Sequence, residues 1–377
     1  MKKALSLIIA VVMISLCFAP ALTASAASQR KVTFGSYPQT EVTKKSELSK
    51  LEAAQKNWKS YNYSYCDMEY ADMDTDGDGD FDYRAVKITT PRSASLISRP
   101  WKNDKGQWVG TRQPYAGYNA GNTYYFKYEP IVWRVLDADK GLLLSDIVLD
   151  SQPYTAAYAE VKDWVRIDGG IYRKFVYGNA PASVWEYSAI RTWLNETFYN
   201  TAFTQDEKAN IKTSEIDNVL LSFATFDNGT LDNNNFTVYS KYPNTRDKVF
   251  LPSASDISNT KYGFTARMGP NSEPADRLCI STDYAKSQGL DYMLQIRELE
   301  RENSSYLLRT TGYGDKIWTV HADGTANEFT EGIDNTDDGI RPEICVNNVS
   351  SLKTYRQSFF AKLLYKIKIF FKVFFTN

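Results

Sequence analysis

The sequence predicts an α+β fold in which short strands alternate with a few helices and long loops. Segments such as Tyr306 to Arg309 and Lys316 to His321 carry the apolar and β-branched residues typical of strands. Helical spacing of apolar residues occurs only in a few short segments, and no repeat of fixed period is present. With 43% hydrophobic and 24% charged residues, the chain has enough apolar material for a sizeable core.

The N-terminal third predicts a strand, a helix and a long irregular stretch. Val32 to Val42 is extended and punctuated by Gly and Pro, and a helical stretch follows from about Ser46 to Tyr61. From Pro91 to Asn122 the composition turns to Gly, Pro, Asn, Ser and Tyr, which predicts a surface excursion. Ile131 to Leu136 and Leu142 to Ser145 then flank an Asp- and Gly-containing turn, which predicts a hairpin.

The later elements begin with a helix that opens at Ser188. Its predicted apolar face carries Ile190, Trp193, Leu194 and Phe198. The Thr204 and Glu207 capping box predicts the start of a second helix, and loops are expected from Asp217 to Asn244. A strand is expected at Val249 to Leu251, followed by a helical turn from Thr282 to Gln288 that is closed by Gly289. An Asp323-Gly324 turn and a closing strand region from Gly339 to Val346 complete the expected elements.

Charge and histidine content exclude some classes of function. Lys and Arg number 44 and Asp and Glu 45, so the chain is no polycation built to cover nucleic acid, and we expect no nucleic-acid partner. The single histidine, His321, rules out histidine-clustered zinc sites and lacks a neighbouring nucleophile motif. An aromatic content of 14% is typical of secreted, strand-rich domains.

Residues 1–26 predict a secretory signal peptide. Lys2 and Lys3 precede an apolar run, and Ala24-Ser25-Ala26 forms a small-residue cleavage site. A retained membrane anchor is the weaker alternative, because the apolar run is short. Cys66, Cys279 and Cys345 remain in the mature chain, so at most one disulfide is expected. The predicted location is secreted, extracellular or associated with the cell envelope of a Gram-positive bacterium.

Residues 351–377 predict a cationic amphipathic helix. One face carries aromatic residues and the other lysines, among them Phe370, Phe371, Phe374, Lys362, Lys366, Lys368 and Lys372. Such a helix lies in an anionic membrane surface, and docking on the acidic body is the alternative. Without this tail and the leader, the chain keeps 36 basic and 45 acidic residues.

An acidic segment predicts a structural calcium site. Asp74, Asp76, Asp78, Asp80 and Asp82 follow the spacing of a calcium loop, which brings carboxylate oxygens round a glycine to one point. Asp80 would contribute its carbonyl, and Asp82 would bind directly or through water. A frame that starts at Asp72 also fits. The usual glutamate at the twelfth position is missing, which favours a weaker extracellular site, and a solvated acidic loop is the alternative.

Several arginines and aromatic residues have open roles. Trp133 is expected in the core, whereas Arg191, Arg309 and Arg341 are expected to pair with carboxylates or carbonyls and lock the fold. The loop aromatics either stack on sugar rings or pack the loops; they include Trp101, Trp108, Tyr115 and Tyr118. No spacing singles out two carboxylates for glycoside cleavage.

Several motifs recur in the order found in a known group of proteins. Phe34 to Gln39, Tyr128 to Leu136, Ile190 to Asn195 and Gly339 to Pro342 resemble a family of secreted bacterial proteins that carry an uncharacterised domain of unknown function. The resemblance spans Val32 to Val346. The closing Gly-x-Arg-Pro strand also resembles C-type-lectin-like and formylglycine-generating-type folds, which implies short twisted antiparallel strands and long loops. A fold by itself does not give function.

These observations divide the chain into four parts. They are the leader (1–26), an N-terminal part with a helix and the aspartate loop (27–122), a C-type-lectin-like α+β body (123–350) and the cationic tail (351–377). The expected function is an exported, calcium-containing binding or adhesion module for a glycan or a protein, without catalysis. The alternative is a secreted hydrolase that cleaves polysaccharide or peptide through Asp and Glu residues.

Overall fold

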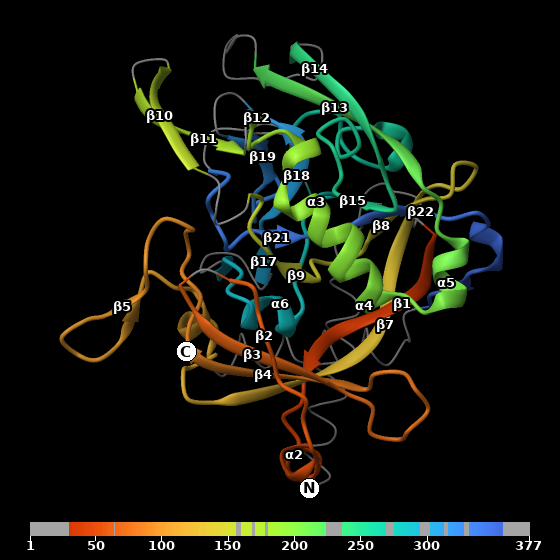
Figure 1. The fold of residues 1–377 in the computed structure, drawn as a ribbon. Helices are drawn as coiled ribbons and strands as arrows, with labels where there is room; N and C mark the ends of the chain where they lie inside the picture. The colour runs from red at the N-terminus through yellow and green to blue at the C-terminus, as the bar shows by residue number, and fades with distance from the viewer. Residues whose placement is uncertain are drawn as a thin grey trace, which may run out of the picture.

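The computed structural model describes residues 30–63, 65–155, 160–167, 170–177, 180–223, 236–268, 275–294, 302–312, 316–327 and 332–356. Within these ranges the chain is strand-rich with few helices and long loops, so the predicted α+β class is confirmed (Figure 1). The predictions for the leader and for the tail residues from 357 onward lie outside the described residues. Among the described helices, none is long and apolar enough to cross a bilayer.

The larger sheet contains nine strands. They are β1 (Lys31–Glu41), β2 (Lys59–Ser60), β3 (Asp67–Met73), β4 (Tyr83–Thr90), β7 (Thr123–Asp137), β8 (Leu142–Ser145), β15 (Val249–Phe250), β22 (Glu343–Cys345) and β23 (Lys353–Thr354). Their order is β15-β22-β8-β7-β4-β3-β2, and β1 pairs with β7 and β23. The long β7 joins strands of the predicted N-terminal part to strands of the predicted body. The hairpin of β7 and β8 was expected and is confirmed.

The second sheet contains seven strands. They are β9 (Asp150–Ser151), β13 (Ser214–Phe223), β14 (Phe236–Asp247), β18 (Tyr306–Thr311), β19 (Ile317–Val320), β20 (Ala326–Asn327) and β21 (Gly339–Ile340). The predicted loops from Asp217 to Asn244 are wrong for the described residues 217–223 and 236–244, because β13 and β14 pair as antiparallel strands there. Burial alternates along β13, with Ile216 and Asn218 inside and Asp217 outside. The buried Asn218 amide donates to the Pro243 carbonyl (2.6 Å), so a polar residue fills a core-facing position.

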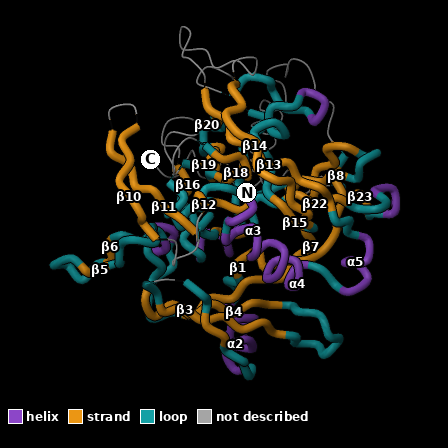
Figure 2. Tube along the Cα trace, turned by 45° about the horizontal axis from the view of Figure 1, so that its top comes forward, coloured by secondary structure: helices purple, strands orange, loops and turns teal. Residues whose placement is uncertain are grey.

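Three small ribbons lie outside these two sheets, and the first two of those named below project from the molecule (Figures 1 and 2). They are β5 (Trp101–Lys102) with β6 (Trp108–Val109), β10 (Glu160–Ile167) with β11 (Gly170–Tyr177) and β12 (Ala180–Pro181), and β16 (Tyr292–Leu294) with β17 (Glu302–Ser304). The excursion between Pro91 and Asn122 contains the β5–β6 ribbon and a 3-10 turn, η1 (Gln113–Ala116). Trp101 and Tyr115 are exposed there, whereas Tyr118 is buried and packs the loop.

The helices are short. They are α2 (Lys45–Ala53), η2 (Trp185–Tyr187), α3 (Ala189–Trp193), η3 (Leu194–Phe198), α4 (Tyr199–Ala202), α5 (Gln205–Asn210), η5 (Thr260–Tyr262), α6 (Asp283–Ser287) and η6 (Val349–Ser351). Helix α2 ends well before the predicted Tyr61, because Ala54 is extended and β2 follows. The capping box of Thr204 and Glu207 at α5 is confirmed, with both reciprocal bonds formed. Helix α6 also forms as expected, followed by Gly289 with positive φ.

A continuous apolar core lies between the elements of both sheets, and Trp133, Trp185 and Trp318 are its largest fully buried side chains. A smaller cluster lies beneath α2. Cys66, Cys279 and Cys345 are free thiols, so no disulfide joins these three residues. Packing and hydrogen bonding therefore carry the stability of the described fold.

The turn between β7 and β8 supplies a test of this packing. Gly141 has φ +77°, and a Cβ added there would overlap the carbonyl oxygen of Val346. Gly106, at the tip of the β5–β6 ribbon, has φ +73° with open space around it. We expect Gly106→Ala to lower the free energy of unfolding by about 1–2 kcal/mol from backbone conformation alone. Gly141→Ala should cost a further ~1–3 kcal/mol because the backbone of β22 must move.

Urea denaturation of the two variants measures the difference. Equal losses would show that the turn does not press against the end of β22.

Candidate functional site

A helical run from α3 to α4 lies between the β13–β14 hairpin and the β3–β4 hairpin (Figure 1). Ser188 caps its start by accepting a bond from the Arg191 amide (3.3 Å). The middle of the run, η3, is a π-helical turn, a wide turn found frequently at functional sites. Leu194 and Phe198 are buried in the core, whereas Trp193 is only half-buried. Trp193 still packs against this core, with its ring 5.8 Å from that of Phe198, so the predicted apolar face is confirmed, and the rest of the ring is exposed.

Two polar side chains fix this run to both sheets. Asp247, at the end of β14, accepts bonds from Arg191 Nε (2.7 Å) and from Trp185 Nε1 (3.0 Å). Asn195 donates to the Val249 carbonyl (2.9 Å) and accepts from the amide of Lys248 (2.8 Å). The expected ion pair of Arg191 is thus confirmed, and it sets where the neighbouring Trp193 can lie.

Trp193 opens onto a pocket of about 350 Å³, which we call the α3 pocket. Its size falls in the range of small-molecule sites. The side chains that give it its chemistry are Tyr63, Arg92, Gln152, Thr192, Trp193, Glu196 and Thr336. Five separate segments of the chain supply them. Sequence reasoning missed this pocket, although the Ile190 to Asn195 motif supplies part of its lining.

Below the α3 pocket, a buried hydrogen-bond network holds Tyr63 and Gln152 in place. Gln152 Nε2 donates to the Tyr63 hydroxyl (2.7 Å) and to Asp150 Oδ1 (3.1 Å). Tyr37 donates to Asp150 Oδ2 (2.5 Å). Burial raises the pKa of Asp150 even though Tyr37, the Ser151 amide and Gln152 all donate to the carboxylate. The side chains that form the floor of the pocket are therefore held in place, and their polar groups already have hydrogen-bond partners.

Arg92 forms part of the pocket wall and is 2% exposed. It donates to the Ser151 carbonyl (2.9 Å), the Ser151 hydroxyl (3.0 Å) and the Thr336 carbonyl. Its guanidinium lies 4.5 Å from the centre of the Tyr63 ring, whose other neighbour is the parallel ring of Tyr61 (5.1 Å). Tyr63 therefore has a cation and a second ring as neighbours, whereas the ring contact of Trp193 is the tilted one with Phe198 (5.8 Å).

On the other flank of the helix lies a second hollow of about 310 Å³, which we call the β14 hollow. Its charged lining comprises Arg191, Glu196, Arg246, Asp247 and Lys248. The two hollows share Thr192 and Glu196, so the helix forms the ridge between them.

The aspartate loop joins β3 to β4 and is exposed. Carboxylate oxygens of Asp74, Asp76 and Asp78 lie within 4.8 Å of one another, so three of the five predicted residues are gathered. Asp74 accepts bonds from the amides of Gly77 (2.7 Å) and Gly79 (3.0 Å), which hold the turn without a cation. Asp82 is separate from the trio: its Oδ2 accepts from the Thr75 amide (2.8 Å) and hydroxyl (2.5 Å).

The alternative frame starts at Asp72, which has another role. Both of its carboxylate oxygens accept bonds from Arg84 (2.6 and 2.9 Å), and Tyr128 donates to one of them (2.7 Å). Arg84 is buried and lies near the rings of Tyr70 (4.7 Å) and Tyr284 (5.5 Å). The structure therefore favours the frame that begins at Asp74.

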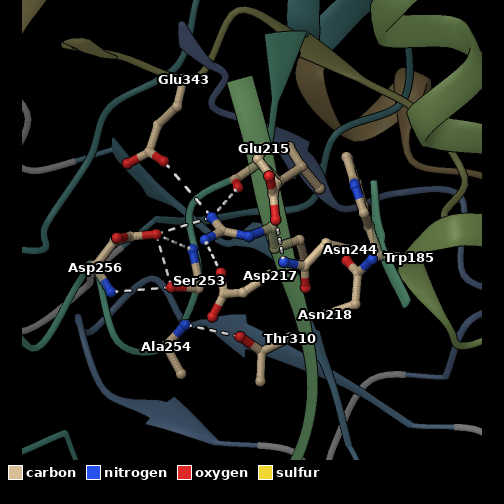
Figure 3. Close-up of polar contacts among 12 residues, drawn as sticks. Trp185, Glu215, Asp217, Asn218, Asn244, Ser253, Ala254, Asp256, Thr310 and Glu343 are labelled. Carbon is tan, nitrogen blue, oxygen red and sulfur yellow. Dashed lines mark hydrogen bonds and ion pairs between the residues drawn. The ribbon is translucent and has the colours of Figure 1, made fainter. Parts of the chain in front are cut away.

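Arg309 is buried and lies at the centre of a group of three carboxylates, as expected of a fold-locking arginine. It pairs with Asp256 (2.8 Å) and Asp217 (2.9 Å) and lies 3.7 Å from Glu343. Figure 3 shows these three carboxylates converging on one guanidinium. The cluster ties β13, β18, β22 and the loop after β15 together.

Within this cluster, Glu343 is fully buried and neither of its carboxylate oxygens has a hydrogen-bond partner. Burial and repulsion from Asp256 raise its pKa well above the usual range, and the attraction of Arg309 does not offset them. Burial also opposes ionisation of Asp256, but Arg309 and bonds from Ser253 outweigh it, so the pKa of Asp256 is lowered.

The remaining predicted residues have structural positions. Trp133 is fully buried, and Arg341 is fully buried with bonds to the Ser145 carbonyl (2.9 Å) and the Tyr306 hydroxyl (3.1 Å). His321 follows β19, outside both hollows. Among the described residues that line the α3 pocket, Glu196 is the one carboxylate, whereas glycoside cleavage requires two.

Comparison with known proteins shows the family. Residues 138–348, more than half of the chain, match the family described as Domain of unknown function (DUF6273), and the chain belongs to it. The expected uncharacterised domain is therefore confirmed. No curated protein and no solved structure matches the chain.

The buried Glu343 predicts a specific dependence of stability on pH. Because its pKa is raised in the folded state, the unfolded chain loses this proton first as pH rises above about 4.5. The carboxylic acid therefore contributes stability at low pH that is lost as pH rises. The glutamine of the Glu343→Gln variant cannot ionise. Above about pH 4.5, the free energy of unfolding of this variant should therefore rise relative to that of the natural protein by up to ~1.4 kcal/mol per pH unit.

Urea denaturation of both proteins between pH 4 and 8 measures this difference. A difference that stays constant across the range would contradict a neutral buried Glu343.

Proposed function

We propose that this protein is an exported, non-catalytic binding module whose α3 pocket takes a glycan. The observation that carries the proposal is the pocket itself, a concave site with an available aromatic face, polar groups on a rigid floor and a single lining carboxylate. The rival reading as a hydrolase has no comparable support among the described residues, because no pair of carboxylates faces this pocket.

The chemistry of the pocket suits a sugar ring. The apolar face of a sugar packs on an aromatic ring, and the half-buried Trp193 offers one. Thr192, Thr197 and Glu196 are exposed beside it and can exchange hydrogen bonds with sugar hydroxyls. The bonds from Gln152 to Tyr63 and Asp150 fix the floor beforehand, which lowers the entropic cost of binding.

The proposal includes the cellular setting and the fold type expected from the sequence. The leader would direct export, and the cationic tail would hold the protein at the anionic surface of a Gram-positive envelope. A C-type-lectin-like architecture for the body is consistent with short antiparallel strands, long loops and projecting ribbons. Glycan or protein partners outside the cell would then meet the α3 pocket.

We also propose that calcium binds the aspartate loop in a structural role. Asp74, Asp76 and Asp78 fit a hard cation, since their oxygens already converge and the loop is exposed to extracellular calcium. Gly77 and Gly79 both have positive φ, which keeps the loop curved round that point. Asp80 would add its carbonyl oxygen, and Asp82 would bind directly or through water.

Removing the aromatic face tests the binding site. We expect Trp193→Ala to weaken glycan binding about tenfold, the loss of roughly 1.4 kcal/mol of ring contact. Trp101→Ala, which removes an exposed ring on the β5–β6 ribbon, should leave affinity unchanged. The measurement is affinity for glycans selected on an array, with product analysis of the same samples.

Equal affinity of both variants would contradict the α3 pocket as the binding site. Release of shorter saccharides by the natural protein, stopped by Glu196→Gln, would establish the hydrolase instead.

Calcium should stabilise the mature protein. With free calcium at a hundred times the dissociation constant, binding adds ~2.7 kcal/mol, so the melting temperature should rise by several degrees over a chelator-treated sample. Asp76→Asn together with Asp78→Asn should abolish that rise, whereas Asp104→Asn on the exposed β5–β6 turn should retain it. Identical melting temperatures with calcium and with chelator would refute the site.

A further inference from the structure

Resting on the proposed glycan-binding function, we infer that the ligand is an acidic, uronic-acid-containing chain that crosses the α3–η3 ridge from the α3 pocket into the β14 hollow. The proposal joins two sites that share a wall. Thr192 and Glu196 line both hollows, so a ligand seated beside Trp193 can continue over the ridge without leaving the surface.

The charge around the ridge is opposite in sign to that of the rest of the body. Residues 27–350 contain more acidic than basic side chains, 45 against 36. The two hollows together are lined by Arg92, Arg191, Arg246 and Lys248 and by Glu196 and Asp247. Arg191 and Asp247 pair with each other (2.7 Å). Outside that pair, three cations, Arg92, Arg246 and Lys248, and one carboxylate, that of Glu196, remain for a ligand. This local excess of positive charge attracts an anionic chain.

Arg92 provides the strongest single indication. It is 2% exposed, and the partners that bond it are neutral oxygens of Ser151 and Thr336. Within the described ranges, its guanidinium forms no ion pair with a carboxylate. A buried cation without a counter-charge is costly, and a carboxylate from a ligand would supply the missing charge.

The other buried arginines of the described fold do not share this combination. Arg84 and Arg309 are paired with aspartates, and Arg277 and Arg341 lie outside both hollows. Arg92 is the buried arginine that lines a pocket large enough for a small molecule.

The β14 hollow offers cations that are exposed or held by neutral groups. Lys248 is half-buried. Its Nζ donates to the Tyr199 hydroxyl (3.2 Å) and lies 4.4 Å from the centre of the Tyr199 ring. Arg246 is exposed on β14 opposite Glu215, and Asn244 donates to the carboxylate of Glu215 (2.7 Å). Successive acidic sugars on one chain could therefore meet Arg92 on one side of the ridge and Arg246 and Lys248 on the other.

Matched polymers test the inference. Alginate, polygalacturonate and hyaluronan would be compared on an array with their carboxyl-reduced forms, which keep the backbone and lose the charge, and with poly(glycerol phosphate). We expect at least one uronate to bind tenfold or more tightly than its reduced form, with affinity that falls as salt is raised from 0.05 to 0.5 M because exposed charges are screened.

The double variant Arg246→Gln, Lys248→Gln should lower affinity for that uronate about tenfold without changing the melting temperature. Arg267→Gln with Lys261→Gln makes the same charge change at exposed positions outside both hollows and should leave affinity unchanged.

The outcomes separate this inference from the function on which it rests. Equal binding of a uronate and its reduced form, or preference for poly(glycerol phosphate), would overturn the acidic-sugar ligand. If a reduced polymer binds in a Trp193-dependent way, the glycan-binding function still stands. If no saccharide binds, both fail together.

Discussion

The position of the α3–η3 run depends on two polar anchors, the buried Asp247 and the half-buried Asn195, and the candidate site depends on that run. Asp247 bonds Arg191 and Trp185 from the end of β14, and Asn195 bonds the backbone beside β15. One anchor belongs to each sheet, so the run is fixed where the two sheets meet. Hydrogen bonds to charged groups are stronger than neutral ones, and breaking one would leave a buried carboxylate unpaired. Trp193 is consequently held at the edge of the core, packed against Phe198 and half-exposed at the α3 pocket.

Buried charge serves two purposes in this fold. The pairs of Arg84 with Asp72 and of Arg309 with Asp256 connect elements that are distant in sequence, and their charges are balanced inside the protein. Such pairs contribute little net stability over apolar packing, but removing one partner is strongly destabilising. Arg92 differs, because neutral oxygens hold its orientation while its charge faces a pocket. That difference is the reason for the proposed role of Arg92 in binding.

Local signals in the sequence predicted local structure well. The Thr204 and Glu207 capping box, the turn that closes at Gly141 and the helical turn before Gly289 rest on contacts between near neighbours, and each is found. The β13–β14 hairpin was missed because its core-facing Asn218 is polar, satisfied by a distant carbonyl of Pro243 that no local pattern records. The family resemblance, by contrast, extended over the segment that the domain match covers.

The candidate site was harder to predict than the elements that carry it. Tyr63, Arg92, Gln152, Trp193 and Thr336 come from segments far apart, and only tertiary packing brings them together. Periodicity placed Trp193 on the apolar face with Ile190, which the structure confirms, but no local pattern shows that part of the ring borders a pocket. The aspartate loop was predictable because its residues are contiguous and its spacing alone gathers three carboxylates.

The most direct test of the account is a crystal structure of the protein with a bound uronic-acid oligosaccharide. The account predicts an intact sugar whose ring packs on Trp193 and whose carboxylate contacts Arg92, with the chain continuing over Thr192. A saccharide bound elsewhere on the molecule, or one found cleaved between two carboxylates, would contradict it.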